Sequence, residues 1–208
     1  MPTLNAQPSS ALDEETARSE LYGLLALVYY APPATEFIAE LRTSATEAPA
    51  AGAFLEEPWR ALVGVARSMT DDEIQSEFST LFGGMGKPEV YLYGSHFLSG
   101  FLNEKPLARL RTDLDQLGLA RDDKMSETED HFAYLCEVMR YLIAGDDVAV
   151  ANLTRQRAFF TQHIQPWVNT LCDDLQKHPK ARFYAAVAEL TRAFMSVEAQ
   201  GFDMLESN

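Results

Sequence analysis

The segment SETEDHF, residues 126–132, brings together side chains that could do acid–base chemistry or hold a cation. These side chains are Glu127, Glu129, Asp130 and His131. Ser126 and Glu129 also have the S-x-x-E spacing of a helix capping box, and an acid in the first turn of a helix stabilises it by about 0.3–1 kcal/mol. An apolar stretch, YLCEVMRYLI, follows. The pattern therefore predicts a helix from residue 127, and capping accounts for the acids but not for His131.

The rest of the chain carries no catalytic or metal-binding signature. Its four histidines and two cysteines have no H-E-x-x-H or C-x-x-C spacing, and Cys136 and Cys172 lie in apolar helical patterns typical of buried, unpaired thiols. GGMGK resembles a phosphate loop, but Leu81 and Pro88 stand where that loop needs Gly and Ser/Thr. Ser95 in YGSHF lacks the strand–turn–helix setting of a nucleophile elbow. We predict no enzyme active site, no metal and no cofactor.

Acidic residues are in clear excess. The 208 residues include 31 Asp and Glu against 17 Lys and Arg, a formal charge of −14, and Lys and Arg form no cluster. Nucleic acid is therefore not an expected partner, and the charge favours a cationic one. The same charge would also keep the protein in solution without serving any partner.

The chain is expected to be a cytoplasmic protein. Its longest apolar run, LYGLLALVYYA at residues 21–31, is shorter than the about 20 residues needed to cross a bilayer. The first residues, MPTLNAQPSSALDEE, have no basic region followed by a hydrophobic segment, so no export signal is expected.

Apolar residues recur at helical spacing along most of the chain, which predicts an all-α fold of eight or nine helices. The expected helices lie near residues 17–31, 35–42, 58–69, 71–82, 107–117, 127–144, 147–176 and 183–197. Pro166 must kink or split the seventh run, and Thr70 with Glu73 forms a capping box before the fourth. We predict one compact domain over residues 15–205 after a flexible segment at residues 1–14.

The middle of the chain is the exception to this pattern. Residues 83–102, GGMGKPEVYLYGSHFLSGFL, contain five glycines and show no helical period before Phe97. We expect a long glycine-rich loop with one extended segment at its Val-Tyr-Leu-Tyr run.

Three segments together resemble the cytoplasmic redox-enzyme maturation chaperones of the TorD/DmsD family. They are EFSTLFGG…KPEVYLYGSHFLSG (77–100), ETEDHFAYLCEVMRYLIAGD (127–146) and FFTQHIQPWVNTLCDDL (159–175) followed by ARFYAAVAELTRAFM (181–195). They match, in order, the family's E-[YF]-x-x-L-F helix with a Y/W-G-S-like turn, its E-P-x-D-H helix start and its H-x-x-P-W turn. The resemblance covers roughly residues 15 to 200.

This resemblance implies a function. The family's members bind the twin-arginine signal peptide and catalytic subunit of a molybdenum or tungsten enzyme, and hold that client in the cytoplasm until its pterin cofactor is inserted. Segments YLYGSHFLSGFLNEKPLARLR and ETEDHFAYLCEVMRYLIAGDD look like the branch associated with formate dehydrogenases, which is the expected client. The family includes monomers and domain-swapped dimers; we expect a monomer, with a domain-swapped dimer as the alternative.

The resemblance also assigns residues. By position, the D-H pair is Asp130 and His131, the loop turn is Tyr93, Gly94 and Ser95, and the E-F-x-x-L-F helix supplies Glu77, Phe78, Leu81 and Phe82. Thr128 stands where the family usually has proline, so we expect a less rigid helix start for which the capping box compensates.

A receptor for a twin-arginine signal needs an apolar groove beside carboxylates. The residues predicted to bind the client are Asp130, His131, Glu127, Glu129, Tyr91, Tyr93, Gly94, Ser95, Phe97 and Phe82, with Phe101 and Met85 adding apolar surface.

Two other functions fit parts of the pattern. A small hydrolase or lyase could use Asp130 and His131 as an acid–base pair, but it would need a nucleophile or a metal that the sequence lacks. A helical adaptor for an unrelated partner would need none of the family's ligands. Turnover that is lost in His131→Ala would favour the first, and recovery of no molybdoenzyme subunit with the protein would favour the second.

Overall fold

The computed structural model describes residues 10–46, 55–83, 87–122 and 124–206. Within these residues the chain forms ten helices and no strand, which confirms the all-α prediction. The helices are α1 (Ser10–Tyr30), α2 (Thr35–Thr43), α3 (Glu56–Ser68), α4 (Asp71–Phe82), α5 (Gly94–Ser99), α6 (Lys105–Gln116), α7 (Phe132–Ala144), α8 (Leu153–His163), α9 (Gln165–Lys177) and α10 (Phe183–Glu206).

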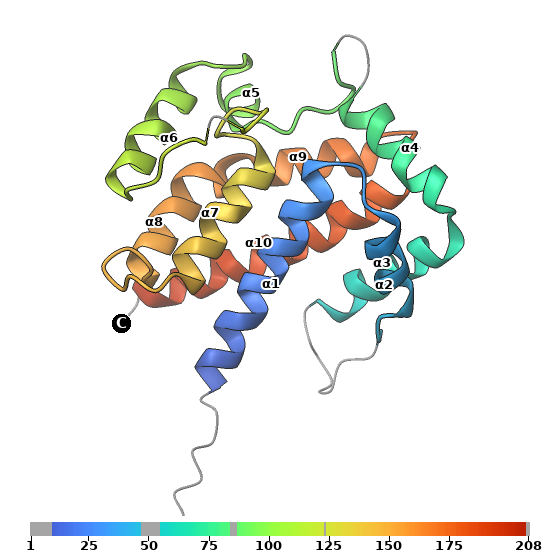
Figure 1. Ribbon diagram of the computed structural model, residues 1–208, viewed down its shortest axis with the longest axis horizontal. Helices are drawn as coiled ribbons and strands as arrows, with labels where there is room; N and C mark the ends of the chain where they lie inside the picture. Colours follow the sequence, from blue (N-terminus) through green and yellow to red (C-terminus); the bar gives the residue numbers. More distant parts are fainter. Residues whose placement is uncertain (1–9, 47–54, 84–86, 123, 207–208) are drawn as a thin grey trace, which may run out of the picture.

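The helices pack in two layers. Figure 1 shows α1 and α7 side by side in front of the long α10 and of α9, with α2 to α4 gathered at one end and α5 and α6 at the other. The most extensive helix pairs are α1 with α7 and α9 with α10. Residues 87–93, which lead into α5, run along the top of the molecule in this view, above the start of α7.

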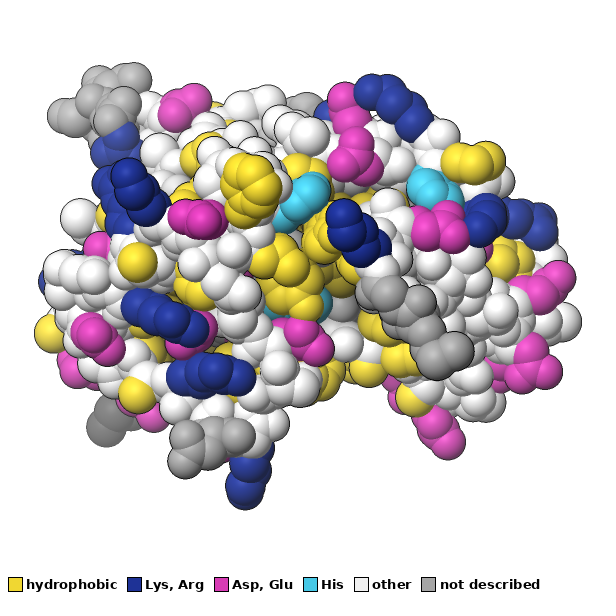
Figure 2. Space-filling model, turned by 90° about the horizontal axis from the view of Figure 1, so that it is seen from above, with side chains coloured by type: hydrophobic (Ala, Val, Ile, Leu, Met, Phe, Trp, Pro, Cys, Tyr) yellow, Lys and Arg dark blue, Asp and Glu magenta, His cyan; other side chains and the backbone are white. Residues whose placement is uncertain are grey.

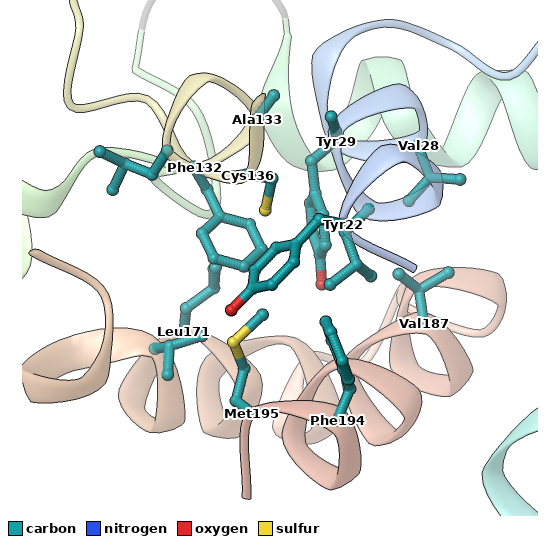
Figure 3. Packing of buried hydrophobic residues seen from close by; sticks show 14 of the residues in the cluster. Tyr22, Val28, Tyr29, Phe132, Ala133, Cys136, Leu171, Val187, Phe194 and Met195 are labelled. Atoms are coloured by element: carbon teal, nitrogen blue, oxygen red, sulfur yellow. The ribbon is translucent and has the colours of Figure 1, made fainter. Parts of the chain in front are cut away.

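Aromatic side chains fill the space between the layers. Figure 3 shows Tyr22 and Tyr29 of α1, Phe132 of α7 and Phe194 of α10 pointing toward one another, with ring centroids 4.9 Å apart for Tyr22 and Phe194 and 5.1 Å apart for Tyr29 and Phe132. The hydroxyl of Tyr22 donates to Glu198 at 2.9 Å, so its buried polar end is satisfied. This core ties α1 and α7 to α10.

The helix boundaries predicted from proline and from the first capping box are confirmed. Glu73 N–H donates to the Thr70 hydroxyl at 3.3 Å, and Thr70 N–H donates to the Glu73 carboxylate at 2.7 Å. The run at 147–176 is split between α8 and α9 at Ile164, two residues before Pro166. Both cysteines, Cys136 and Cys172, are buried and unpaired.

The second predicted capping box is wrong. Helix α7 begins at Phe132 and not at residue 127, and its N-cap is His131, whose Nδ1 accepts a hydrogen bond from Ala133 N–H at 3.2 Å. The carboxylate of Glu129 binds Arg111 instead of capping the helix. His131 is extended, and hydrogen bonds between the 92–95 segment and residues 130 and 132 on either side of it outweigh the local capping pattern.

Two other boundaries differ from the sequence expectation. Helix α5 begins at Gly94, inside the segment expected to be a loop up to Phe97. Helix α1 begins at Ser10, so residues 10–14 of the segment expected to be flexible are helical, and residues 1–9 lie outside the described structure. None of the described helices has both the length and the apolar character that membrane crossing requires. In the same residues, no three His, Cys, Asp or Glu side chains cluster as metal ligands would.

Glu77 joins α4 to the first turn of α10. Its carboxylate is 7% exposed and accepts backbone hydrogen bonds from Arg182 at 2.9 Å, Phe183 at 3.1 Å and Tyr184 at 2.8 Å. These are N–H groups at the start of α10 that have no partner within the helix, and the helix dipole favours a negative charge there. The residue that opens the E-F-x-x-L-F motif therefore holds α4 on α10.

We expect Glu77→Gln to lower the free energy of unfolding by about 2–3 kcal/mol, because the amide cannot accept all three N–H groups and brings donors of its own to the site. Urea unfolding followed by circular dichroism measures the loss. Glu189→Gln, an exposed position on α10, is the matched control and should change the free energy by no more than about 0.5 kcal/mol. Equal effects of the two variants would contradict this account of Glu77.

Candidate functional site

The residues singled out by the sequence meet where the segment before α5 passes over the start of α7. Phe132 N–H donates to the Leu92 carbonyl at 2.7 Å, and Gly94 N–H donates to the Asp130 carbonyl at 2.9 Å. Tyr93 and His131 form an isolated antiparallel bridge between these bonds. We call residues 91–97 together with residues 126–132 the crossing.

Asp130 is the centre of the crossing. Its side chain is buried, and its Oδ2 accepts a hydrogen bond from Ser95 N–H at 2.8 Å. Its Oδ1 accepts one from the Thr128 hydroxyl at 2.6 Å. Thr128 therefore stabilises the start of α7 through its hydrogen bond to Asp130. The capping box of Ser126 and Glu129, which was expected to compensate for the missing proline, does not form.

His131 is buried among three tyrosine rings. The ring centroids of Tyr93, Tyr134 and Tyr30 lie 5.2, 5.8 and 6.5 Å from that of His131. Burial lowers the pKa of His131 to about 4, although the nearby carboxylates of Glu127 and Asp130 oppose this shift. The ring is therefore neutral at physiological pH.

The hydrogen bond at Nδ1 of His131 also fixes its tautomer. Because Nδ1 accepts the hydrogen bond from Ala133 N–H, the proton of the neutral ring lies on Nε2. The side chain of Asp130 binds Ser95 and Thr128 in place of the imidazole. The geometry thus gives no support to an acid–base pair of Asp130 and His131.

The two glutamates of the segment have different partners. The hydroxyl of Tyr93 donates to the carboxylate of Glu127, which is half-buried. Glu129 is bound through both oxygens by the guanidinium of Arg111 on α6, at 2.9 Å from Nε and 2.8 Å from Nη2. Burial acts to raise the pKa of Glu129, but the hydrogen bonds from Arg111 outweigh it and hold this pKa below its usual value.

The apolar side of the crossing rests on stacked rings. Phe97 stacks on Trp167 of α9, with centroids 5.1 Å apart and planes 13° apart, and Tyr91 stacks on His96 at 4.1 Å. Trp167 is fixed by a hydrogen bond of 2.6 Å from its Nε1 to the carbonyl of His163. Figure 2 shows the face above the α4–α5 connection, where hydrophobic side chains gather in a hollow with histidine side chains beside them.

Six of the ten predicted site residues meet at the centre of the crossing, and the others lie around it. The six are Glu127, Asp130, His131, Tyr93, Gly94 and Ser95. Tyr91 and Phe97 flank them, Glu129 is bound by α6, and Phe82 packs on Tyr184 at the end of α4, with centroids 4.9 Å apart. Phe101 is 70% exposed, and Met85 lies outside the described residues.

Sequence reasoning missed four residues of the site: Tyr30, Arg111, Tyr134 and Trp167. The H-x-x-P-W turn contained a signal for Trp167, since the resemblance included that turn without giving the tryptophan a role. Nothing in the local pattern of α6 pointed from Arg111 to Glu129.

Comparison with known proteins shows the family of the chain. The family model described as nitrate reductase delta subunit matches residues 48–173, which include the whole crossing and Trp167. The chain belongs to the nitrate reductase delta subunit family. The prediction of a TorD-like family is thereby confirmed, while the formate dehydrogenase branch stays a prediction.

Individual relatives carry the name of a chaperone. "Chaperone protein TorD" of Aliivibrio fischeri is 26% identical over 136 residues, which cover 62% of this chain and 63% of that protein. The protein of the same name from Ferrimonas balearica is 30% identical over 145 residues, covering 67% of this chain and 64% of that protein. The chain thus matches slightly less than two thirds of the length of these two relatives.

The burial of His131 makes the stability of this family member depend on pH. The pKa of histidine in an unfolded chain is about 6.5, whereas the pKa of His131 in the fold is about 4. The neutral ring therefore contributes its full stability above about pH 6.5, and this contribution is lost as the pH falls toward 4. His131→Asn should keep the N-cap and remove this dependence. Between pH 7 and pH 4, wild type should lose up to about 3 kcal/mol more than the variant.

Urea unfolding at a series of pH values measures this difference. His163 and the carboxylates are present in both proteins, so their titrations cancel in the comparison. Parallel curves for the two proteins would show that His131 is not buried as a neutral ring.

Gly94 should tolerate no side chain. A Cβ at Gly94 would lie 3.2 Å from Nε1 of Trp167, and that ring is buried and hydrogen-bonded. Gly94→Ala is therefore expected to lower the free energy of unfolding by about 1–3 kcal/mol. Gly64→Ala in α3, where no atom lies within 4 Å of the new Cβ, should raise it by about 0.5–1 kcal/mol. Thermal unfolding of both variants tests the contrast, and stabilisation by both would refute it.

Proposed function

We propose that this chain is a maturation chaperone that binds the twin-arginine signal peptide and catalytic subunit of a molybdenum or tungsten oxidoreductase in the cytoplasm. The observation that carries the proposal is membership of the nitrate reductase delta subunit family together with relatives named as TorD chaperones. The formate dehydrogenase client rests on the resemblance of residues 91–111 and 127–147 to that branch.

The crossing suits a cationic peptide, but its acidic residues have different roles. Asp130 is 3% exposed, and both its oxygens accept hydrogen bonds from neutral donors, so its part is to hold the crossing together. Glu127 is more exposed and is bound by the neutral hydroxyl of Tyr93, so its carboxylate stays within reach of solvent. Glu127 is therefore the carboxylate of the crossing that meets a client arginine first.

Aromatic side chains in and beside the crossing provide an apolar surface for the rest of the signal peptide. A twin-arginine signal continues from its cationic end into an apolar segment, and aromatic rings provide a large apolar surface with little conformational freedom to lose. Tyr30 of α1 is 45% exposed beside Tyr134 of α7, and Tyr91 and Phe97 belong to the 91–97 segment of the crossing. The acidic charge of the whole protein, −14, attracts the peptide before contact.

A helical adaptor for an unrelated partner is the second candidate. It is favoured by three exposed apolar side chains after the crossing, Leu98, Phe101 and Leu102, which lie on or just beyond α5. Such an adaptor would bind its partner equally well in the presence and absence of a twin-arginine peptide.

The signal-peptide proposal is tested by calorimetry with a synthetic formate dehydrogenase signal peptide. Glu127→Gln should weaken binding about tenfold, about 1.4 kcal/mol, because a charged hydrogen-bond partner is lost. Binding to wild type should also weaken as salt is raised from about 0.05 M to 0.15 M, since the attraction is screened. Glu36→Gln, an exposed acid on α2 outside the crossing, is the charge-matched control and should bind as wild type does.

Two outcomes would count against the proposal at different levels. Equal binding of a peptide whose two arginines are replaced by glutamine would exclude recognition of the twin-arginine motif. Binding of a twin-arginine signal from another molybdoenzyme, but not of the formate dehydrogenase signal, would keep the chaperone class and remove the formate dehydrogenase client.

A further inference from the structure

A small apolar pocket opens between the α6–α7 connection and the outer face of α7. Its volume is about 280 Å³, below the about 300–1,000 Å³ of sites for drug-sized ligands, so it suits one or two apolar side chains. Apolar and aromatic side chains make up most of its wall: Leu114, Leu119, Met125, Tyr134, Val138 and Tyr141. We call it the α6–α7 pocket.

The α6–α7 pocket adjoins the crossing through two shared residues. Tyr134, in its wall, also lies against the ring of His131, with centroids 5.8 Å apart. Glu129, also in its wall, belongs to the 126–132 segment and is separated from Glu127 by a single residue. A peptide whose arginine meets Glu127 therefore has a second carboxylate and an apolar pocket directly beside it.

The pair of Glu129 and Arg111 is unequal in its exposure. The side chain of Glu129 is 9% exposed, whereas that of Arg111 is 49% exposed. The guanidinium holds the carboxylate through two parallel hydrogen bonds, which is the arrangement that any arginine adopts with a carboxylate. One arginine can therefore replace the other without changing the number or type of hydrogen bonds to Glu129, and the released Arg111 already lies largely in water.

We propose that Arg111 holds the place of a client arginine: when the signal peptide binds, one of its arginines displaces Arg111 from Glu129, and an apolar side chain next to it enters the α6–α7 pocket. This inference rests on the proposed function and adds a second subsite to it. The occupant must carry both a guanidinium and an apolar side chain, because the wall of the pocket is apolar and its deepest charge is the carboxylate of Glu129.

The other charged residues of the pocket wall do not offer the same exchange. Glu137 pairs with Arg140 at 3.0 Å, and both side chains are about half exposed, so an ion pair there is screened by water. Arg121 donates to the carbonyl of Met125 at 2.7 Å, which fixes it within the α6–α7 connection. Glu129 is the acid of this wall that combines burial with an exposed cationic partner.

A double-mutant cycle tests the exchange. Calorimetry with a synthetic formate dehydrogenase signal peptide should give about fivefold to tenfold tighter binding to Arg111→Gln, because the internal competitor is gone. Glu129→Gln should weaken binding about tenfold. In the Glu129→Gln background, Arg111→Gln should have no effect, since there is no carboxylate left to compete for.

Two further variants test whether the α6–α7 pocket is occupied and whether the change in affinity is specific to Arg111. Val138→Phe fills the α6–α7 pocket and should weaken binding about tenfold, while leaving the helical circular dichroism unchanged. Arg109→Gln removes another exposed arginine of α6, one that donates to Gln162 and not to Glu129, and should bind as wild type does. If Arg111→Gln fails to fold, Arg111→Lys keeps the charge without the paired hydrogen bonds and should tighten binding to a smaller extent.

The outcomes separate this inference from the proposed function. If wild type binds no twin-arginine peptide, the proposed function is wrong. If wild type binds but Arg111→Gln (or Arg111→Lys) leaves the affinity unchanged or lowers it, or if its effect persists in the Glu129→Gln background, the exchange is wrong and the chaperone function stands.

Discussion

The structure depends on one buried carboxylate, that of Asp130, which joins two segments just before each becomes a helix. Its side chain accepts from Ser95 N–H and its carbonyl accepts from Gly94 N–H, so the start of α5 is fixed on the residue that precedes the N-cap of α7. Because an unpaired buried carboxylate is costly, Asp130 and the α5 segment must be placed together or not at all. The stacking of Phe97 on Trp167 follows from this placement.

Other acids are used in the same way, which changes the meaning of the net charge. Glu77 holds the first N–H groups of α10, and Glu198 accepts two hydrogen bonds from Arg18, at 2.7 and 2.9 Å, and one from Tyr22 across the two layers. Part of the acidic excess therefore consists of buried carboxylates that hold helices together and are not accessible to a partner. In the proposed function, the charge that steers a cationic peptide belongs to exposed acids and to half-buried ones such as Glu127.

The sequence was informative wherever a helix is decided by its own residues. The apolar period and the prolines placed α2 within one residue and split α8 from α9, because propensity, burial and chain breaks agree there. The start of α7 was misplaced because residues 92–95, far along the chain, form hydrogen bonds with residues 130 and 132 and hold His131 between them extended, against a valid local capping pattern. Helix α5, with six residues, is too short to show a period.

The site residues also divide into those that local motifs predicted and those that they did not. In the proposed function, this division bears on how the chain stays folded without its signal peptide. Motifs brought Tyr93 to Ser95 together with Asp130 and His131, but no local pattern named Arg111 as the partner of Glu129. A carboxylate that awaits a cationic peptide must be satisfied meanwhile, since burial without a partner would destabilise the fold. Asp130 meets this need with two neutral donors, Ser95 N–H and the Thr128 hydroxyl, whereas Glu129 meets it with a half-exposed arginine, which in the proposed exchange an incoming arginine replaces at equal hydrogen-bonding. The exposure of the partner, more than that of the acid itself, therefore distinguishes an anchoring carboxylate from a receiving one.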